Sequence, residues 1–170
     1  NVTGSTLDKT LSIVVQTPPT GESVYTTPGT FTWTAPAYVT SVSAVAVGGG
    51  AAGQSSPSAA GGGGGLGWKN NISVSPGSNY TVVVGRRGER ISVDNASLMN
   101  GGDSYFISTG TVKGGKGTFD TSLSSDTTYG GGGTYTGDGG GNGGDGAWGT
   151  GGREPGGGGA GGYTGSGGRG

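Results

Sequence analysis

Residues 68–84 read WKNNISVSPGSNYTVVV, and this stretch indicates the fold class more clearly than any other. Apolar and polar side chains alternate over residues 68–74 and again over residues 80–84, which is the period of a β-strand. Pro76 and Gly77 lie between the two runs. They suit a type II turn, because Pro fixes φ at roughly −65° and Gly accepts a positive φ. The stretch therefore predicts a β-hairpin.

Three segments that precede the hairpin also have the composition of strands: Leu11–Gln16, Thr30–Thr34 and Val39–Val47. The first two are each followed within two residues by a proline, which cannot continue a central strand. No segment of useful length shows the i, i+3, i+4 apolar spacing of an amphipathic helix. The sequence therefore predicts an all-β fold, with a small sheet or sandwich that supports the rest of the chain.

Glycine dominates the C-terminal part of the chain, which holds most of the 46 glycines. From Gly137 to Gly152 a glycine recurs at every third residue, and after Pro155 the same period continues, one residue out of phase, from Gly156 to Gly168. A period of three belongs to extended left-handed helices with three residues per turn. It is the period neither of a strand nor of an α-helix.

Two states remain open for these glycine blocks. A flexible linker has this composition, whereas a bundle of polyglycine II helices would place one glycine line against each neighbouring helix. Collagen is disfavoured because neither block contains proline beside glycine. Interleaved aromatic residues and a plausible turn at Pro155 favour the bundle, so we predict a glycine-rich region packed as polyglycine II helices.

The residue types of the chain argue against most catalytic functions. Cys and His are both absent, which excludes thiol chemistry, histidine-ligated zinc and a Ser–His–Asp nucleophile. The few carboxylates are not set in apolar surroundings, so no general acid and base pair is indicated. We predict no enzyme activity, no cofactor and no metal site, although a calcium ion near Asp145 stays open because residues 140–145 match the start of one calcium-binding repeat.

Other partners are limited by charge and hydropathy. A net charge of −1 gives little attraction for nucleic acid. No apolar run approaches the roughly 20 residues that span a bilayer.

Aromatic and short polar side chains of the glycine-rich region are the candidate binding residues. Tyr and Trp rings stack on the apolar faces of sugars, while Asp, Asn and Arg bond their hydroxyls. An equally open alternative is that the rings only shield the flank of the bundle. The candidates are Tyr129, Tyr135, Asp138, Asn142, Asp145, Trp148, Arg153 and Tyr163.

Three motifs carry a resemblance to a known family. They are TPGTFTWTAP at residues 27–36, VTSVSAVAVGGG at residues 39–50 and VSPGSNYTVVVG at residues 74–85. Together with the glycine run at 61–65 they resemble the glycine-rich domain of tail-fibre and receptor-recognition proteins of tailed bacteriophages.

The resemblance implies a fibre-tip adhesin, located extracellularly on the virion, that attaches the phage to a bacterial surface polysaccharide or outer-membrane receptor. It also implies a homotrimer that joins other fibre or baseplate proteins. On this view residues 1–24 are a connector or first strand, 25–112 the β-rich core and 113–170 the glycine-rich region. Two alternatives are a purely structural fibre segment without a receptor site and an ice-binding polyglycine II protein.

Overall fold

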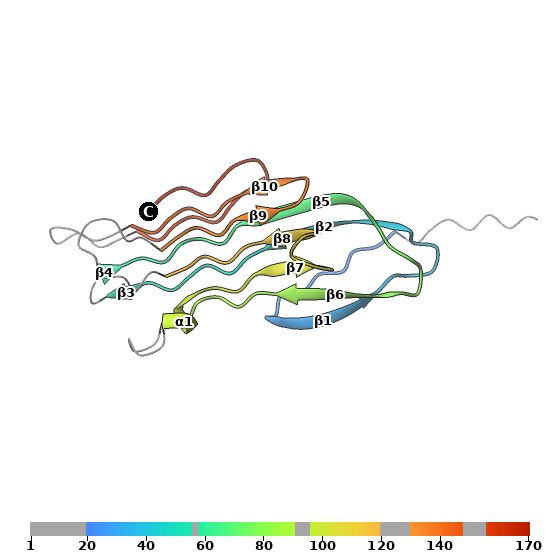
Figure 1. The fold of residues 1–170 in the computed structure, drawn as a ribbon, viewed down its shortest axis with the longest axis horizontal. Helices are drawn as coiled ribbons and strands as arrows, with labels where there is room; N and C mark the ends of the chain where they lie inside the picture. Colours follow the sequence, from blue (N-terminus) through green and yellow to red (C-terminus); the bar gives the residue numbers. More distant parts are fainter. Residues whose placement is uncertain (1–19, 56–57, 91–95, 120–129, 148–155) are drawn as a thin grey trace, which may run out of the picture.

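The computed structural model describes residues 20–55, 58–90, 96–119, 130–147 and 156–170. Nearly all regular structure in these ranges is β, which confirms the predicted fold class (Figure 1). One helical turn, α1 (Ala96–Met99), is the only helix among the described residues. The strands are β1 (Gly29–Thr34), β2 (Ser41–Val47), β3 (Gln54–Ser55), β4 (Ser58–Ala59), β5 (Leu66–Ser73), β6 (Asn79–Val84), β7 (Ser104–Phe106), β8 (Val112–Gly114), β9 (Tyr135–Thr136) and β10 (Gly139–Gly141).

The strands form a sandwich of two antiparallel sheets and one short separate ladder. The larger sheet has the order β1-β6-β7-β8-β9 and the smaller one the order β10-β5-β2, while β3 pairs with β4. Ala46 and Ile72 from the smaller sheet meet Phe106 and Val112 from the larger one in a single buried cluster. Trp33 packs edge-on against Phe106, with ring centroids 5.7 Å apart.

The predicted hairpin is wrong, although its turn and both of its strands are confirmed. Gly77 has a φ of 77°, and the amide of Ser78 donates to the carbonyl of Ser75 at 3.0 Å, as in a β-turn. However, β5 pairs with β2 and β10, whereas β6 pairs with β1 and β7. The chain crosses between sheets at the turn, so Ile72 and Val82 meet across the core. In a hairpin they would share one sheet.

The other predicted strands fall into two groups. Segments 30–34 and 39–47 are confirmed as β1 and β2, with ends shifted by one or two residues. Leu11–Gln16 lies outside the described residues. No helix in the described part of the chain is long and apolar enough to cross a membrane.

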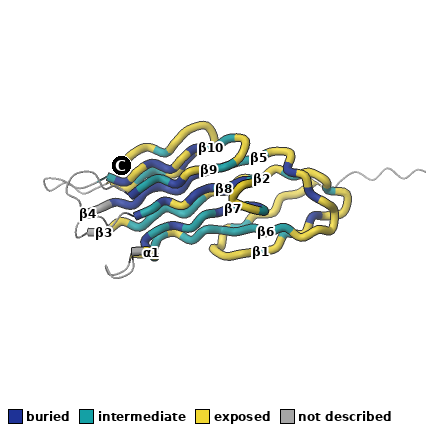
Figure 2. The backbone as a smooth tube through the Cα atoms, viewed as in Figure 1, coloured by how far each residue is buried: buried dark blue, intermediate teal, exposed yellow. Residues whose placement is uncertain are grey.

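Beyond the sandwich, glycine runs pack side by side in a hydrogen-bonded bundle. At its centre lies the run Gly61–Gly65, which is buried throughout (Figure 2). Along residues 60–65, two residues that are three apart form backbone hydrogen bonds to the same neighbouring glycine run. Two residues that follow each other directly form such bonds to different neighbouring runs. These bonds join Gly62 and Gly65 to residues 118 and 115, Gly61 and Gly64 to residues 158 and 161, and Ala60 and Gly63 to residues 147 and 144. A strand has hydrogen-bonding neighbours on two sides only, so this is the geometry of packed polyglycine II helices.

The predicted glycine line of the first block faces this central run. A Cβ built at Gly137, Gly140, Gly143 or Gly146 would lie within 2.4 Å of a backbone oxygen of residues 60–68. No side chain fits at such distances, so the period of three records backbone contact. Gly149, Gly152 and the expected turn at Pro155 lie outside the described residues.

The predicted phase of the second block is wrong. Tight backbone contacts occur at Gly158 and Gly161, where a Cβ would lie 1.9 Å from a carbonyl oxygen, whereas a Cβ at Gly165 would meet nothing within 4 Å. The cause is a chain reversal, since the amide of Gly162 donates to the carbonyl of Gly165 at 2.9 Å. The block therefore makes two short runs instead of one long helix.

The bundle contains residues from both sides of the predicted domain boundary between residues 112 and 113. Runs at 48–51 and 61–65 lie before it and runs at 115–118 and 141–147 after it. A second buried cluster, made of Met99 and Phe119, lies within the bundle half of the molecule. The division into three units stays a prediction.

Candidate functional site

The structure describes five of the eight predicted binding residues. Tyr129, Trp148 and Arg153 lie outside the described residues. The side chains of the other five are all exposed, as expected for contacts with a ligand: Tyr135, Asp138, Asn142, Asp145 and Tyr163.

Two of these five residues contact Trp68 of β5. The indole Nε1 of Trp68 donates to the backbone carbonyl of Tyr163 at 3.1 Å, and the amide of Asp138 donates to the carbonyl of Trp68 at 2.8 Å. The indole lies directly on β10, because a Cβ at Gly139 would be 2.5 Å from its Cζ2 atom. The glycine at this position is therefore what allows Trp68 to lie flat against β10.

Val45 continues the exposed apolar row across the smaller sheet. It is directly opposite Trp68 in the β2–β5 register, so the two side chains share one face of the sheet. Val45 is 49% and Tyr163 59% exposed. We call Val45, Trp68 and Tyr163 the Trp68 patch.

An ion pair follows Trp68 by one residue along β5, at the turn between β9 and β10, where strand alternation directs Lys69 to the face opposite the indole. The Nζ atom of Lys69 donates to Oδ1 of Asp138 at 2.8 Å, and the amide of Asn70 donates to Oδ2 at 2.9 Å. The hydrogen bond from Lys69, followed by that from Asn70, lowers the pKa of the Asp138 carboxyl. The pair is solvent-accessible, with side chains 36% and 39% exposed, so a ligand hydroxyl can reach it.

Tyr135 does not join the Trp68 patch. Its ring lies against Gly140, where a Cβ would be 2.9 Å from its Cδ2 atom. Neighbouring residues of a strand point to opposite faces, and Trp68 lies on Gly139. Tyr135 is therefore on the other face of β10.

Asn142 and Asp145 are placed farther along the glycine run and contribute to the bundle. The carbonyl of Asn142 accepts from the amide of Gly167 at 2.7 Å. Oδ1 of Asp145 accepts from the amide of Gly132 at 2.9 Å. Among the described residues, no three acidic, His or Cys side chains are grouped so that they could hold a metal ion.

Several chain ends that flank undescribed ranges meet at one end of the bundle. The amide of Ala147 donates to the carbonyl of Gly156 at 2.9 Å, and that of Gly146 to the carbonyl of Gly130 at 2.8 Å. This is the end where the C-terminus lies (Figure 1).

Sequence reasoning missed Trp68, Lys69 and Val45 as site residues. Their alternating pattern assigned them to strands, and that assignment is correct. Nothing local shows that β10 lies beside β5, because β10 consists of glycine alone. The signal available in the sequence was a Trp followed directly by the polar residues 69–71 in a predicted strand.

Comparison with known proteins gives one match. The model of a protein family described as a glycine-rich domain matches residues 26–170. No curated protein and no solved structure matches the chain.

Proposed function

The chain belongs to this glycine-rich domain family, and we propose that it is a non-catalytic adhesin at the tip of a bacteriophage tail fibre. Its receptor in this proposal is a bacterial surface polysaccharide, and its place is the outside of the virion. The observation that supports the proposal most is the Trp68 patch, which presents aromatic and apolar surface at the edge of the sheet that also carries an accessible ion pair.

The chemistry of the patch fits a sugar ring. An exposed Tyr163 ring and the Trp68 indole offer apolar faces for stacking. Asp138, whose amide bonds to Trp68, and Lys69, the next residue of β5, offer a charged acceptor and a charged donor, which make the stronger hydrogen bonds. The resemblance of residues 27–85 to phage fibre domains adds the bacterial surface as the source of the sugar.

The bundle supports this role by rigidity. Trp68 lies between β2 and β10 in the smaller sheet, and β10 continues into glycine runs whose backbones bond to one another. A site on a rigid support loses less conformational entropy on binding. In the fibre, the domain would form a homotrimer that joins other fibre or baseplate proteins. Its receptor could include an outer-membrane protein together with the polysaccharide.

The proposal is tested by adsorption of the intact domain to bacterial cells and to a panel of surface polysaccharides. Tyr163→Ala should weaken binding about tenfold, which corresponds to about 1.4 kcal/mol, because it removes a stacking ring. Tyr38→Ala is the matched control, since Tyr38 is 56% exposed against 59% for Tyr163. Equal binding by both variants would remove the Trp68 patch from the proposal.

A structural fibre segment is the second candidate, and the backbone bundle favours it. A rod held together by backbone hydrogen bonds can carry load without any receptor site. Failure of the intact domain to bind any cell or polysaccharide would support this candidate over the adhesin.

A further inference from the structure

The strand β2 is an open edge of the smaller sheet. It pairs with β5 on one side, and no strand among the described residues pairs with it on the other. Its residues alternate between the core face and an exposed face that carries Val45 and Val47, 49% and 50% exposed. Proteins usually protect such edges with charges or proline, and residues 41–47 contain neither.

A groove follows this edge along its whole length. Its volume is about 1400 Å³, and every residue of β2 lines it. The opposite wall is the segment 20–28, which we call the strap, and Trp33 and Phe106 of the larger sheet also line the groove. The space therefore lies next to β2 and over the aromatic side of the larger sheet.

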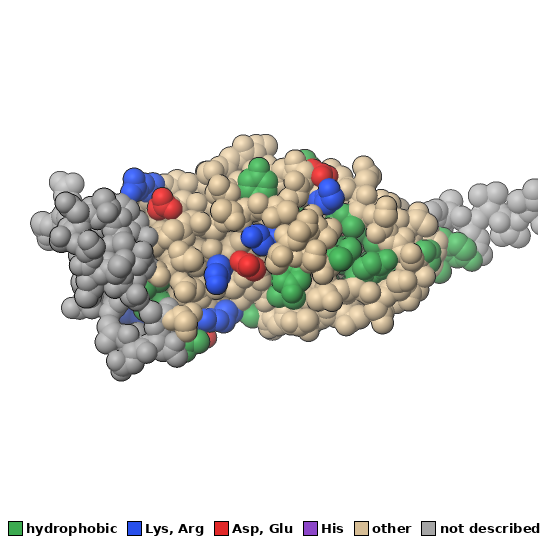
Figure 3. All heavy atoms as spheres, in the orientation of Figure 1, with side chains coloured by type: hydrophobic (Ala, Val, Ile, Leu, Met, Phe, Trp, Pro, Cys, Tyr) green, Lys and Arg blue, Asp and Glu red, His purple; other side chains and the backbone are tan. Residues whose placement is uncertain are grey.

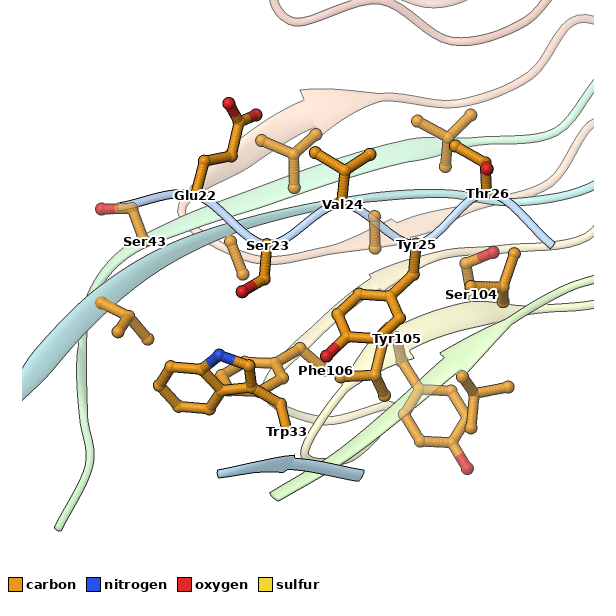
Figure 4. A pocket seen from close by; sticks show the side chains of 18 of the residues that line it. Glu22, Ser23, Val24, Tyr25, Thr26, Trp33, Ser43, Ser104, Tyr105 and Phe106 are labelled. Carbon is orange, nitrogen blue, oxygen red and sulfur yellow. The ribbon is translucent and has the colours of Figure 1, made fainter. Parts of the chain in front are cut away.

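The strap does not close the edge of β2. Among the described residues, no backbone hydrogen bond joins it to β2. Figure 4 shows its Tyr25 side chain pointing toward Phe106 and Trp33, while Val24 and Glu22 point away. The Tyr25 ring packs on Phe31 of β1, with centroids 5.2 Å apart. The strap is thus held from the side of β1, so among the described residues the outer side of β2 has no strand partner.

The walls of the groove determine what can occupy it. Glu22 and Arg87 are the only charged residues that line it among the described residues, and no charged residue occurs between Glu22 and Lys69 in the sequence. On the face that Figure 3 shows, hydrophobic side chains gather over the sandwich half of the molecule, and charged side chains are few. A charged segment would lose hydration without gaining a partner, so the groove is complementary to an uncharged one.

We propose that this groove binds an extended, uncharged segment of a partner chain, which adds to β2 as a fourth strand of the smaller sheet. Strand addition uses the free backbone groups of β2 for affinity and the alternating side chains for specificity. The segment carries small or β-branched residues at alternate positions, opposite Val45 and Val47. This inference does not depend on the proposed receptor binding.

A pair of labelled peptides tests the inference on the intact chain. The heptapeptide TVTVTVT should bind at least tenfold more tightly than TKTKTKT in a fluorescence anisotropy titration, because only the second brings charges into the groove. Amide hydrogen exchange should slow in β2, and not in β1, when TVTVTVT is added. No binding, equal binding of the two peptides, or protection outside β2 would overturn the proposal.

Substitutions on the two edge strands provide the control. Val47→Lys should weaken TVTVTVT binding at least threefold, whereas Thr32→Lys, on the exposed face of the edge strand β1, should leave it unchanged. Equal loss in both variants would contradict the assignment to β2. A dimer that Val47→Lys dissociates would assign the groove to a second copy instead. Binding of TVTVTVT only after removal of residues 1–19 would assign it to the chain's own N-terminal residues. Either result overturns the partner-chain proposal.

Discussion

The sandwich and the glycine bundle are two different solutions to building a core from few apolar residues. In the sandwich, side chains fill the interior, and the rings of Trp33, Tyr80 and Phe106 lie within 6.0 Å of one another. In the bundle, backbones fill the interior, and a Cβ at Gly63 would lie 2.0 Å from a carbonyl oxygen. The sandwich is stabilised by packing of large side chains, whereas the backbones of the bundle can approach this closely only where residues have no side chain.

Two features stabilise the ordered bundle: hydrogen bonds between its glycine runs, and the strands that several of these runs adjoin. Fixing a residue costs roughly 1–2 kcal/mol, most for Gly, and one hydrogen bond returns about 0.5–1.5 kcal/mol net. A single glycine run would therefore not be stable. Runs 48–51, 115–118 and 142–147 directly continue β2, β8 and β10, and run 61–65 directly precedes β5. Strands of the sandwich thus place these four runs next to one another, where their backbones bond.

Removing a side chain should harm the sandwich most. Phe106→Ala should lower the free energy of unfolding by about 3–5 kcal/mol, because it leaves a cavity between Trp33 and Tyr80. Denaturant unfolding measures the loss. The hydrogen-exchange rates of the Gly62, Gly63 and Gly65 amides in the same variant show whether the bundle depends on the sandwich. Unchanged protection of these amides would show that the bundle is stable without it.

Adding one methyl group should harm the bundle. Gly63→Ala places a Cβ against the backbone of Gly159, which cannot move as a side chain would, so we expect a loss of about 3 kcal/mol, the upper end for overpacking. Gly168→Ala is the matched control, since a Cβ there meets nothing within 4 Å. Equal unfolding free energies of the two variants would contradict backbone contact at the centre of the bundle.

The smallest effect concerns the ion pair at the edge between the two regions. Since its pKa is lowered in the folded chain, Asp138 stabilises the fold above the ordinary pKa of the carboxyl group, and this contribution is lost as the pH falls through the lowered value. Asp138→Asn should therefore be slightly less stable than the native chain at neutral pH and equal to it in strong acid. Thermal unfolding across pH measures the difference, and a loss in Asp138→Asn that persists unchanged in strong acid would contradict the ion pair as its cause.

Local patterns in the sequence predicted elements well and their partners poorly. Alternation and the Pro76-Gly77 pair identified two strands and their turn, because both signals lie within a few residues. They gave the wrong pairing, since a Pro-Gly turn fits a hairpin and a crossover between sheets equally. Three candidate binding residues lie outside the described residues. Of the other five, Asp138 and Tyr163 lie at Trp68, which was not predicted as a site residue.

The glycine period shows the same limit at a finer scale. It correctly assigned the contact line from Gly137 to Gly146, where the run is straight. It gave the wrong line after Gly156, because the reversal at Gly162–Gly165 is formed by residues that also suit a straight run.

By itself the sequence determined the β class, the polyglycine II period and the poverty of charged and catalytic residue types. These properties follow from backbone preferences and composition, which act over a few residues. Tertiary structure alone decided which strands pair, that Trp68 lies on β10, and that no other described strand pairs with the outer side of β2. Glycine has no side chain to specify a neighbour, so the neighbours of runs 48–51, 61–65, 115–118 and 142–147 are set by the strands that these runs adjoin.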